Sequence, residues 1–348
     1  MTVGRRAFLA AVGALGLAGC APAAAPLPQQ RPAGPRQPGV VTPAPPRTEL
    51  AAFDVTARDR EGLAAVLRAL SEPVPGVTLT VAVGASLFDG RFGLERPRLL
   101  TPMPSFRSDV LDPAWCHGDL LVQASAATAE PLERVSATKI PGLAPRWRQA
   151  GFHPDAENRN LFGFREGAGN PDAADSALMD RLVWVGPGDD EPAWCAGGSY
   201  QVVRLIRLAT PTWNSKPVPD QERVFGRAKD SGAPLGRETE TEIPDYASDP
   251  RGEVIALDAH IRRANPRTPD SDAHRILRRS YSFGDEGTGA GHIFICFQRD
   301  VELGFATIQK RLAGEALERY TLPFGGGYYF VLPGRADGHD HLGQAMLA

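Results

Sequence analysis

The sequence predicts an α+β fold built from two ferredoxin-like halves, each with the order strand, helix, strand, strand, helix, strand (βαββαβ). Short runs of alternating apolar and polar residues, typical of half-buried strands, recur in both halves of the chain. Runs with apolar residues at helical spacing separate them. With 348 residues, 42% of them hydrophobic, the chain is long enough to bury two such units. We expect their antiparallel sheets to form a sandwich or an open barrel.

The N-terminal half, residues 49–190, contains a complete βαββαβ pattern. "AAFDVTA" alternates as a strand does, "REGLAAVLRALSE" has the spacing of an amphipathic helix, and "RLVWVG" is a short apolar run that would close the unit. The predicted strands are 51–57, 76–84, 119–126 and 181–186, and the predicted helices are 60–72 and 129–139.

The C-terminal half, residues 191–348, repeats the theme around a long polar insertion at 214–278. "SYQVVRLIRLA" and "GHIFICFQ" are apolar and β-branched enough to predict strands, and "GGGYYFVLP" predicts a final strand. The predicted strands are 199–209, 291–298 and 325–333, with a helix at 301–314.

The first twenty residues resemble an export signal. Arg5 and Arg6 precede an apolar run that is short for a membrane span, and together they resemble a twin-arginine signal, which directs export of folded proteins. "LAGC" resembles a lipobox in which Cys20 is lipidated, although a plain secretory peptide is the alternative. Residues 21–48 are rich in proline and alanine, so we expect a tether. We therefore expect an exported protein, lipid-anchored on the outer face of the cytoplasmic membrane or periplasmic or extracellular.

Charge and cysteine content exclude some functions. The formal net charge is −3 without a basic stripe, which argues against a nucleic-acid partner. No CxxC motif supports a zinc knuckle or a thioredoxin-like site. Cys116 and Cys195 could pair in an oxidising compartment, or they and Cys296 could be three buried thiols.

Among the seven histidines, only His260 has a supporting cluster. His339 and His341 could bind a metal, but an exposed polar tail is the favoured interpretation. His117, His153, His274 and His292 lie in no obvious constellation.

His260 lies in an arginine-rich segment that also has apolar residues. The nearby arginines are Arg262, Arg263, Arg267, Arg278 and Arg279. An imidazole, several guanidiniums and apolar walls would suit haem, with iron on the histidine and propionates on arginines. The alternative from these residues alone is a structural basic loop.

The chain from about residue 50 to 345 resembles a dye-decolourising (DyP-type) peroxidase, in particular the exported deferrochelatase/peroxidase branch. The motifs that carry the resemblance, in order, are "GASLFDGRFGLERPRLL", "GDLLVQASA", "RNLFGFREGAGNP", "GGSYQVVRLIRL", "GRAKDSGAPLG", "HIRRANPR", "ILRRSYSFG", "IFICFQRD" and "PFGGGYYF". The resemblance implies a DyP-type sandwich or open barrel that holds one non-covalent haem b per chain.

The resemblance also implies roles for individual residues. His260 matches the proximal iron ligand, Arg278 the distal arginine that stabilises developing negative charge, and Arg227 a propionate ligand. A carboxylate is expected to bind the second nitrogen of His260, and Glu318 is the predicted group. The other expected haem contacts are Gly167, Ala168 and Gly169 on the distal side, Asn265, Pro266 and Arg267 beyond the ligand, and Phe294 and Phe297 in the apolar wall.

The distal loop, residues 161–171, departs from the family pattern GFxDG. Glu166 stands where the family has an aspartate that takes a proton from peroxide and returns it, and Ala168 replaces a threonine. The two carboxylates have a similar intrinsic pKa. The extra methylene nevertheless moves the carboxylate by roughly 1.5 Å, and a misplacement of about 1 Å can cost about 100-fold in rate.

Three functions follow from the resemblance. The first is a haem peroxidase that reduces hydrogen peroxide through a ferryl intermediate and oxidises bulky organic donors such as dyes and phenols. The second is release of iron from a haem substrate with the porphyrin intact. The third is a non-catalytic haem-binding or redox-sensing lipoprotein. The sequence leaves open whether the chain forms a homo-oligomer.

Overall fold

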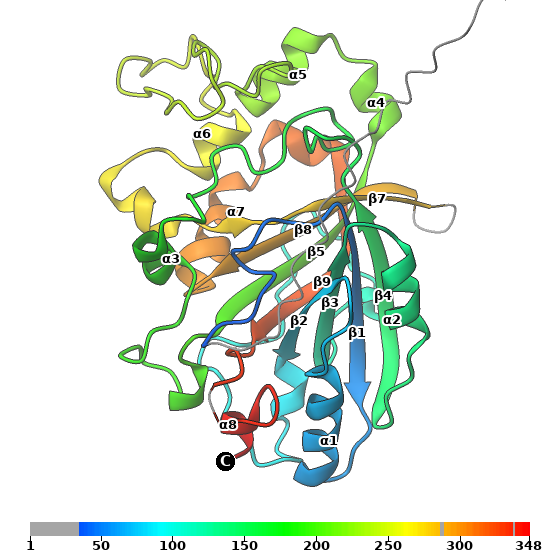
Figure 1. The fold of residues 1–348 in the computed structure, drawn as a ribbon. Coiled ribbons are helices and arrows are strands. Elements are labelled where there is room, and N and C mark those ends of the chain that lie inside the picture. The colour runs from blue at the N-terminus through cyan, green and yellow to red at the C-terminus, as the bar shows by residue number, and fades with distance from the viewer. Residues whose placement is uncertain (1–34, 286–288, 337) are drawn as a thin grey trace, which may run out of the picture.

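The computed structural model describes residues 35–285, 289–336 and 338–348 (Figure 1). The expected signal at 1–20 and residues 21–34 of the expected tether lie outside the described residues. Residues 35–46 do not behave as a tether, because Val40 is fully buried and Gln37 exchanges hydrogen bonds with backbone groups of Val81 and Leu332. The packed part of the chain therefore begins before residue 49.

The N-terminal half forms the predicted βαββαβ unit. Its elements are β1 (Arg47–Val55), α1 (Arg60–Leu70), β2 (Val77–Gly84), β3 (Leu120–Ala126), α2 (Glu130–Ala137) and β4 (Leu143–Phe152). The strands are antiparallel in the order β2-β3-β1-β4, as in a ferredoxin-like sheet.

The closing strand of this half is β4, and the prediction of a strand at 181–186 is wrong. The carboxylate of Asp175 caps α3 (Ser176–Leu182) by accepting from the backbone N–H of Leu178. The apolar run after it is buried without joining the sheet. In β4, alternation between buried Trp147 and Gln149 and outward arginines is the true strand signal, which Pro145 and the charges obscured.

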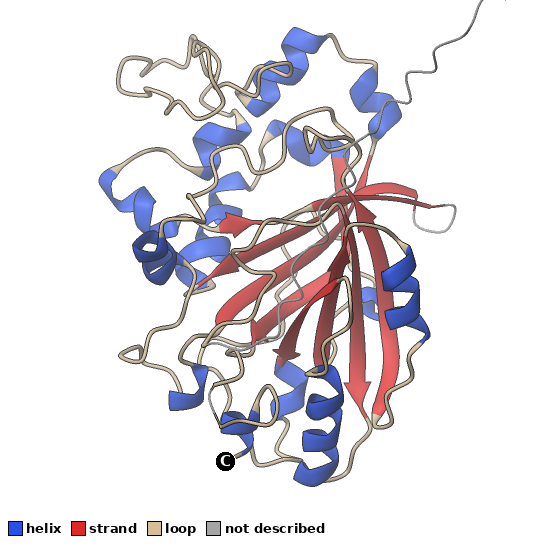
Figure 2. Ribbon diagram, in the orientation of Figure 1, coloured by secondary structure: helices blue, strands red, loops and turns tan. Residues whose placement is uncertain are grey.

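The C-terminal half repeats the topology with the insertion between its first two strands. Its elements are β5 (Ser199–Leu208), β6 (Leu277–Arg278), β7 (Tyr281–Asp285), β8 (Gly289–Gln298), a π-helical turn η5 (Glu302–Ala306) that continues into α7 (Thr307–Leu312), and β9 (Thr321–Val331). β5 lies between β9 and β8, and both β6 and β7 pair with β8. Contacts of β2 with β9 and of β4 with β7 join the halves into one continuous barrel-like sheet (Figure 2).

Helix α1 shows how the core is built. Its N-cap Asp59 accepts from the backbone N–H of Gly62, which satisfies an otherwise free donor. Leu63, Val66, Leu67 and Leu70 form one buried stripe at helical spacing. Each such side chain contributes about 1.5–3 kcal/mol relative to exposure.

The insertion and the segment that leads into it place three short helices beyond one end of the sheet, opposite the end near α1 (Figure 1). They are α4 (Thr210–Asn214), α5 (Val218–Phe225) and α6 (His260–Ala264). The remaining short elements are η1 (Ala85–Phe88), η2 (Pro113–Trp115), η3 (Ala193–Cys195), η4 (Pro269–His274), η6 (Ala316–Tyr320) and α8 (Gln344–Leu347).

The three cysteines of the described residues are free and buried. The alternative of three buried thiols is therefore confirmed, and Cys116 and Cys195 form no disulfide. His341 is also buried, with Nδ1 2.7 Å from the carbonyl oxygen of Leu342, so the expectation of an exposed tail is wrong for this residue. Within residues 35–285, 289–336 and 338–348, no helix is long and apolar enough to cross a membrane.

Candidate functional site

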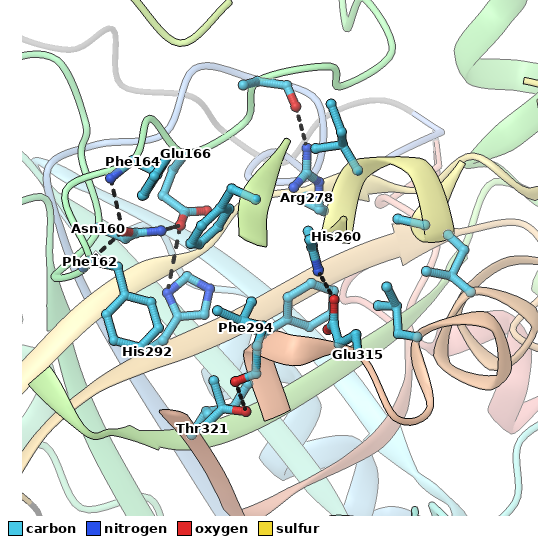
Figure 3. Close-up of a pocket in the computed structure, with 18 of the residues that line it drawn as sticks. Asn160, Phe162, Phe164, Glu166, His260, Arg278, His292, Phe294, Glu315 and Thr321 are labelled. Atoms are coloured by element: carbon cyan, nitrogen blue, oxygen red, sulfur yellow. Dashed lines mark hydrogen bonds and ion pairs between the residues drawn. The ribbon is translucent and has the colours of Figure 1, made fainter. Parts of the chain in front are cut away.

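A cavity lies where the insertion and the distal loop meet the sheet (Figure 3). The distal loop contributes Glu166 and Ala168, α6 contributes His260, and β8 contributes His292 and Phe294. Residues far apart in the sequence, from both halves of the chain, therefore share one hollow. Its apolar walls include Ile261, Phe225, Ile276 and Leu312.

His260 is held by Glu315 rather than by the predicted Glu318. Its Nδ1 lies 2.7 Å from Oε2 of Glu315, whereas the Glu318 carboxylate accepts from the backbone N–H of Gly314. Glu315 immediately precedes η6 and is buried, so the turn of η6 separates the two carboxylates. With Nδ1 engaged, Nε2 is the ring nitrogen left for a metal ion.

Arg278 is fastened to the distal loop. Its Nη2 donates to the carbonyl oxygen of Ala168 at 2.7 Å, and its Nε donates to Oδ1 of Asn170 at 3.2 Å. Gly167 and Gly169 have φ of 81° and 79°, values that glycine adopts without strain. The two glycines thus allow the tight loop that brings a carboxylate and this guanidinium to the same place.

Glu166 points towards two polar side chains. Its Oε1 accepts from Nδ2 of Asn160 at 2.7 Å and lies 3.8 Å from Nδ1 of His292 (Figure 3). Burial lowers the pKa of His292, an effect that the Glu166 charge opposes. The sequence contained a signal for His292, because this residue alternates with Phe294 on β8 and so shares its face.

Four guanidiniums along the cavity have buried Nε atoms without a hydrogen-bond partner among the described residues: Arg165, Arg227, Arg267 and Arg275. Arg165 is already paired with the carboxylates of Glu157 and Glu240. Burial, and next the nearby charge of Arg278, lower the pKa of Arg227 to about 10. Gly169 leaves room for this side chain, since a Cβ there would lie 3.0 Å from its Nη2. Arginine side chains that line the cavity give it positive charge, which fits an anionic ligand such as a haem propionate.

The remaining predicted residues divide between the cavity and its supports. Asn265 lines the cavity and accepts from the backbone N–H of Arg267, whereas Pro266 does not line it. Arg262 pairs with Asp249 at 3.0 Å, and Arg263 donates to backbone carbonyl groups of Arg311 and Ala313. Arg279 is buried and donates to the carbonyl oxygen of Thr42.

Phe297 does not belong to the apolar wall, contrary to prediction. Phe294 lines the cavity, but Phe297 is fully buried in a separate core cluster with Leu277 and Tyr281. An odd separation along a strand places two side chains on opposite faces.

The donor set fits haem. One imidazole nitrogen can bind iron, arginine side chains that line the cavity can bind propionates, and aromatic and aliphatic walls can contact the porphyrin. No group of three or more histidine, cysteine or acidic side chains in the described part of the chain forms an alternative metal site.

Comparisons with known proteins agree with this geometry. The family profiles described as Dyp-type peroxidase, N-terminal and C-terminal, match residues 69–152 and 157–336. A deferrochelatase of Escherichia coli strain K12 is 41% identical, with 99% of this chain and 96% of the relative covered. The crystal structure of a DyP-type peroxidase from Cellulomonas bogoriensis is 34% identical, has a TM-score of 0.80 and matches 90% of this chain and 96% of its own.

Ferric DtpA from Streptomyces lividans is similarly close, at 33% identity and a TM-score of 0.80 over 92% of this chain and 97% of its own. The profiles, the curated relative and the solved structures all cover both halves of the fold. The chain therefore belongs to the DyP-type peroxidase family, whose members bind haem b and act on peroxide.

Proposed function

We propose that the chain reduces hydrogen peroxide in this cavity and oxidises organic donors with haem b. The observation that carries the proposal is that a carboxylate-held imidazole, His260, shares one cavity with a carboxylate, Glu166, and a fixed guanidinium, Arg278. This set contains an iron ligand, a proton acceptor and a cation, which are the groups that peroxide cleavage needs.

The chain's own residues take distinct parts in this chemistry. Haem, when bound, supplies the electrons that cleave the O–O bond. Nε2 of His260 would hold its iron, while Arg227, Arg267 and Arg275 would bind its propionates. Glu166 accepts a proton from hydrogen peroxide and returns it to the departing oxygen. Arg278 stabilises the negative charge that develops on the way.

The test is stopped-flow absorbance of the haem-loaded protein mixed with hydrogen peroxide. We expect a fast change in the native protein and a slower one in Glu166→Asp, since Asn160 holds the longer side chain in place. Arg278→Leu should lose about 100- to 1000-fold in rate. A native protein that binds haem but reacts no faster than Arg278→Leu would indicate a non-catalytic haem binder instead.

The 41% sequence identity to a protein named deferrochelatase favours a second candidate function, which is removal of iron from haem with the porphyrin left intact. Mass spectrometry of the products separates the two functions. Free protoporphyrin together with chelatable iron would support iron release, whereas an oxidised donor with the haem intact would support the peroxidase.

The N-terminus supports a proposal about location. Arg5, Arg6 and Cys20 fit export by the twin-arginine route followed by lipidation. Replacing both arginines with lysine should retain the protein in the cytoplasm, and Cys20→Ala should release it from the membrane fraction. Export unchanged by the lysine variant would contradict the twin-arginine route.

A further inference from the structure

We infer that His292 is a positioning residue that exchanges a proton with Glu166, so that the distal acid–base group is a Glu166–His292 pair rather than a carboxylate alone. The inference rests on the proposed function, because it concerns how the same cavity handles the proton of hydrogen peroxide.

The sheet fixes His292 in place. Its backbone is paired on one side with Ile206 of β5 and on the other with Ser282 of β7. Strand alternation directs its ring to the cavity face, the face of Phe294. The His292 side chain is 14% exposed and that of Glu166 is 12% exposed, so both are largely shielded from bulk water.

The longer side chain of glutamate brings the carboxylate to this imidazole. Asn160 accepts from the backbone N–H groups of Phe162 and Phe164 through Oδ1, which directs its Nδ2 donor at Oε1 of Glu166. The same oxygen lies 3.8 Å from Nδ1 of His292, which is ion-pair range but longer than a hydrogen bond. A small movement would therefore bring the two groups into hydrogen-bonding distance.

The charges facing the imidazole make it suited to this exchange. Desolvation is the main cause that lowers the pKa of His292, and Arg278 lowers it further, whereas Glu166 raises it. Its neighbours on the flanking strands, Ile206 and Ser282, carry no charge. The Glu166 charge also acts on His153, whose pKa it raises. Burial thus favours the neutral imidazole of His292, and Glu166 is the neighbour whose charge favours its protonation.

The proton balance is simple. One proton leaves one oxygen of hydrogen peroxide for the Glu166 carboxylate and passes to His292, which leaves the carboxylate ionised again. The proton then returns by the same route to the other oxygen. When the O–O bond breaks, with two electrons that bound haem would supply, this second oxygen leaves as water with both hydrogens. The pair ends in its starting protonation state.

The first test needs no haem. Histidine NMR of the unloaded protein gives the pKa of His292, assigned by the signal that disappears in His292→Gln. In Glu166→Gln we expect this pKa to fall by about 1 or more, because the carboxylate that favours the cation is lost. His341→Gln, at a buried histidine outside the cavity, is the matched control and should leave the His292 signal unchanged.

The second test uses the haem-loaded protein and a double-mutant cycle. We expect Glu166→Gln to slow the peroxide reaction by about 100-fold or more. His292→Gln should slow it by about 10-fold and remove the imidazole step from the pH profile. If the two residues act as a unit, the double variant is no slower than Glu166→Gln alone. Melting temperature and haem content must match the native protein.

The outcomes separate the two proposals. Multiplicative losses in the double variant, or a native pH profile in His292→Gln, would overturn the pairing while leaving the peroxidase intact. A native protein that does not react with peroxide would overturn the proposed function. In that case the NMR measurement still tests whether Glu166 and His292 interact. A His292 pKa that is the same in Glu166→Gln as in the native protein would reject the pair.

Discussion

Nδ1 of His260 lies 2.7 Å from Oε2 of Glu315, although the two residues are 55 positions apart in the sequence. The first begins α6 in the insertion and the second precedes η6. A buried carboxylate on this nitrogen fixes the tautomer and the orientation of the ring, and it increases electron donation from a bound imidazole to iron.

Glu315→Gln should therefore weaken haem affinity or peroxidase activity by about 10- to 100-fold. It should also raise the ferric/ferrous reduction potential, because the ligand donates less charge. Haem titration and potentiometry measure both. Glu318→Gln is the matched control, since that carboxylate lies at the same cavity but bonds to the backbone of Gly314. Equal effects of the two variants would contradict the assignment.

Arg227→Met should reduce haem affinity. A hydrogen bond to a charged group contributes about 1.5–3 kcal/mol, which corresponds to roughly 10- to 150-fold in the dissociation constant. Arg223→Met removes an exposed arginine from the neighbouring helix α5, 3.8 Å from Asp258, and should leave affinity unchanged. Unchanged affinity in Arg227→Met, measured by haem titration of the unloaded protein, would exclude this arginine as a propionate ligand.

The sequence predicted two βαββαβ halves and located β1, β2, β3, β5, β8 and β9, because these segments have strand-like apolar patterns; β4, β6 and β7 were not predicted. The prediction failed where the apolar pattern of a segment did not match its place in the folded structure. Residues 182–185 are apolar because they are buried, not because they pair with a strand. β4 is a strand because its partners β1 and β7 are there, although its own sequence contains Pro145 and several arginines.

Asn160→Asp should shift the peroxide reaction towards alkaline pH. The change keeps an acceptor for the N–H groups of Phe162 and Phe164 but places a second negative charge 2.7 Å from Glu166. Two adjacent carboxylates disfavour each other's ionised form, so the rate should be lost first at acidic pH. Asn214→Asp, on the exposed end of α4, is the control for added charge. Superimposable stopped-flow pH profiles of the native protein and Asn160→Asp would contradict the contact.

The sequence predicted the site residues that lie within a recognisable motif. It did not predict those that only the tertiary structure brings to the cavity. His260, Arg278 and Glu166 each stand in a recognisable stretch, and the structure brings all three to one cavity. The choice between Glu315 and Glu318 depends on the turn of η6, which no local pattern specifies. His292 was overlooked because a histidine in an apolar strand is usually a core residue until its neighbours in space are known.

The unloaded protein should lose stability as the pH falls below about 6.5. Burial is the main cause that lowers the pKa of His153, so this imidazole is neutral in the folded state where the unfolded chain already binds a proton. Stability is then complete above the unfolded pKa and declines as pH falls towards the folded value. His153→Gln should flatten this decline in urea unfolding between pH 5 and 7. A variant with the same pH slope as the native protein would show that His153 does not contribute.

Phe294 and Phe297 provide a test of the strand register at the site. Phe297→Ala should destabilise the protein by about 3–5 kcal/mol in urea unfolding, since it opens a cavity in a fully buried cluster. It should leave the absorption spectrum of bound haem unchanged, because Phe297 faces away from the cavity. Phe294→Ala should shift that spectrum and weaken haem binding, because its ring lines the cavity beside His292. A spectral change in Phe297→Ala at equal haem content would place both rings at the cofactor and contradict the alternation along β8.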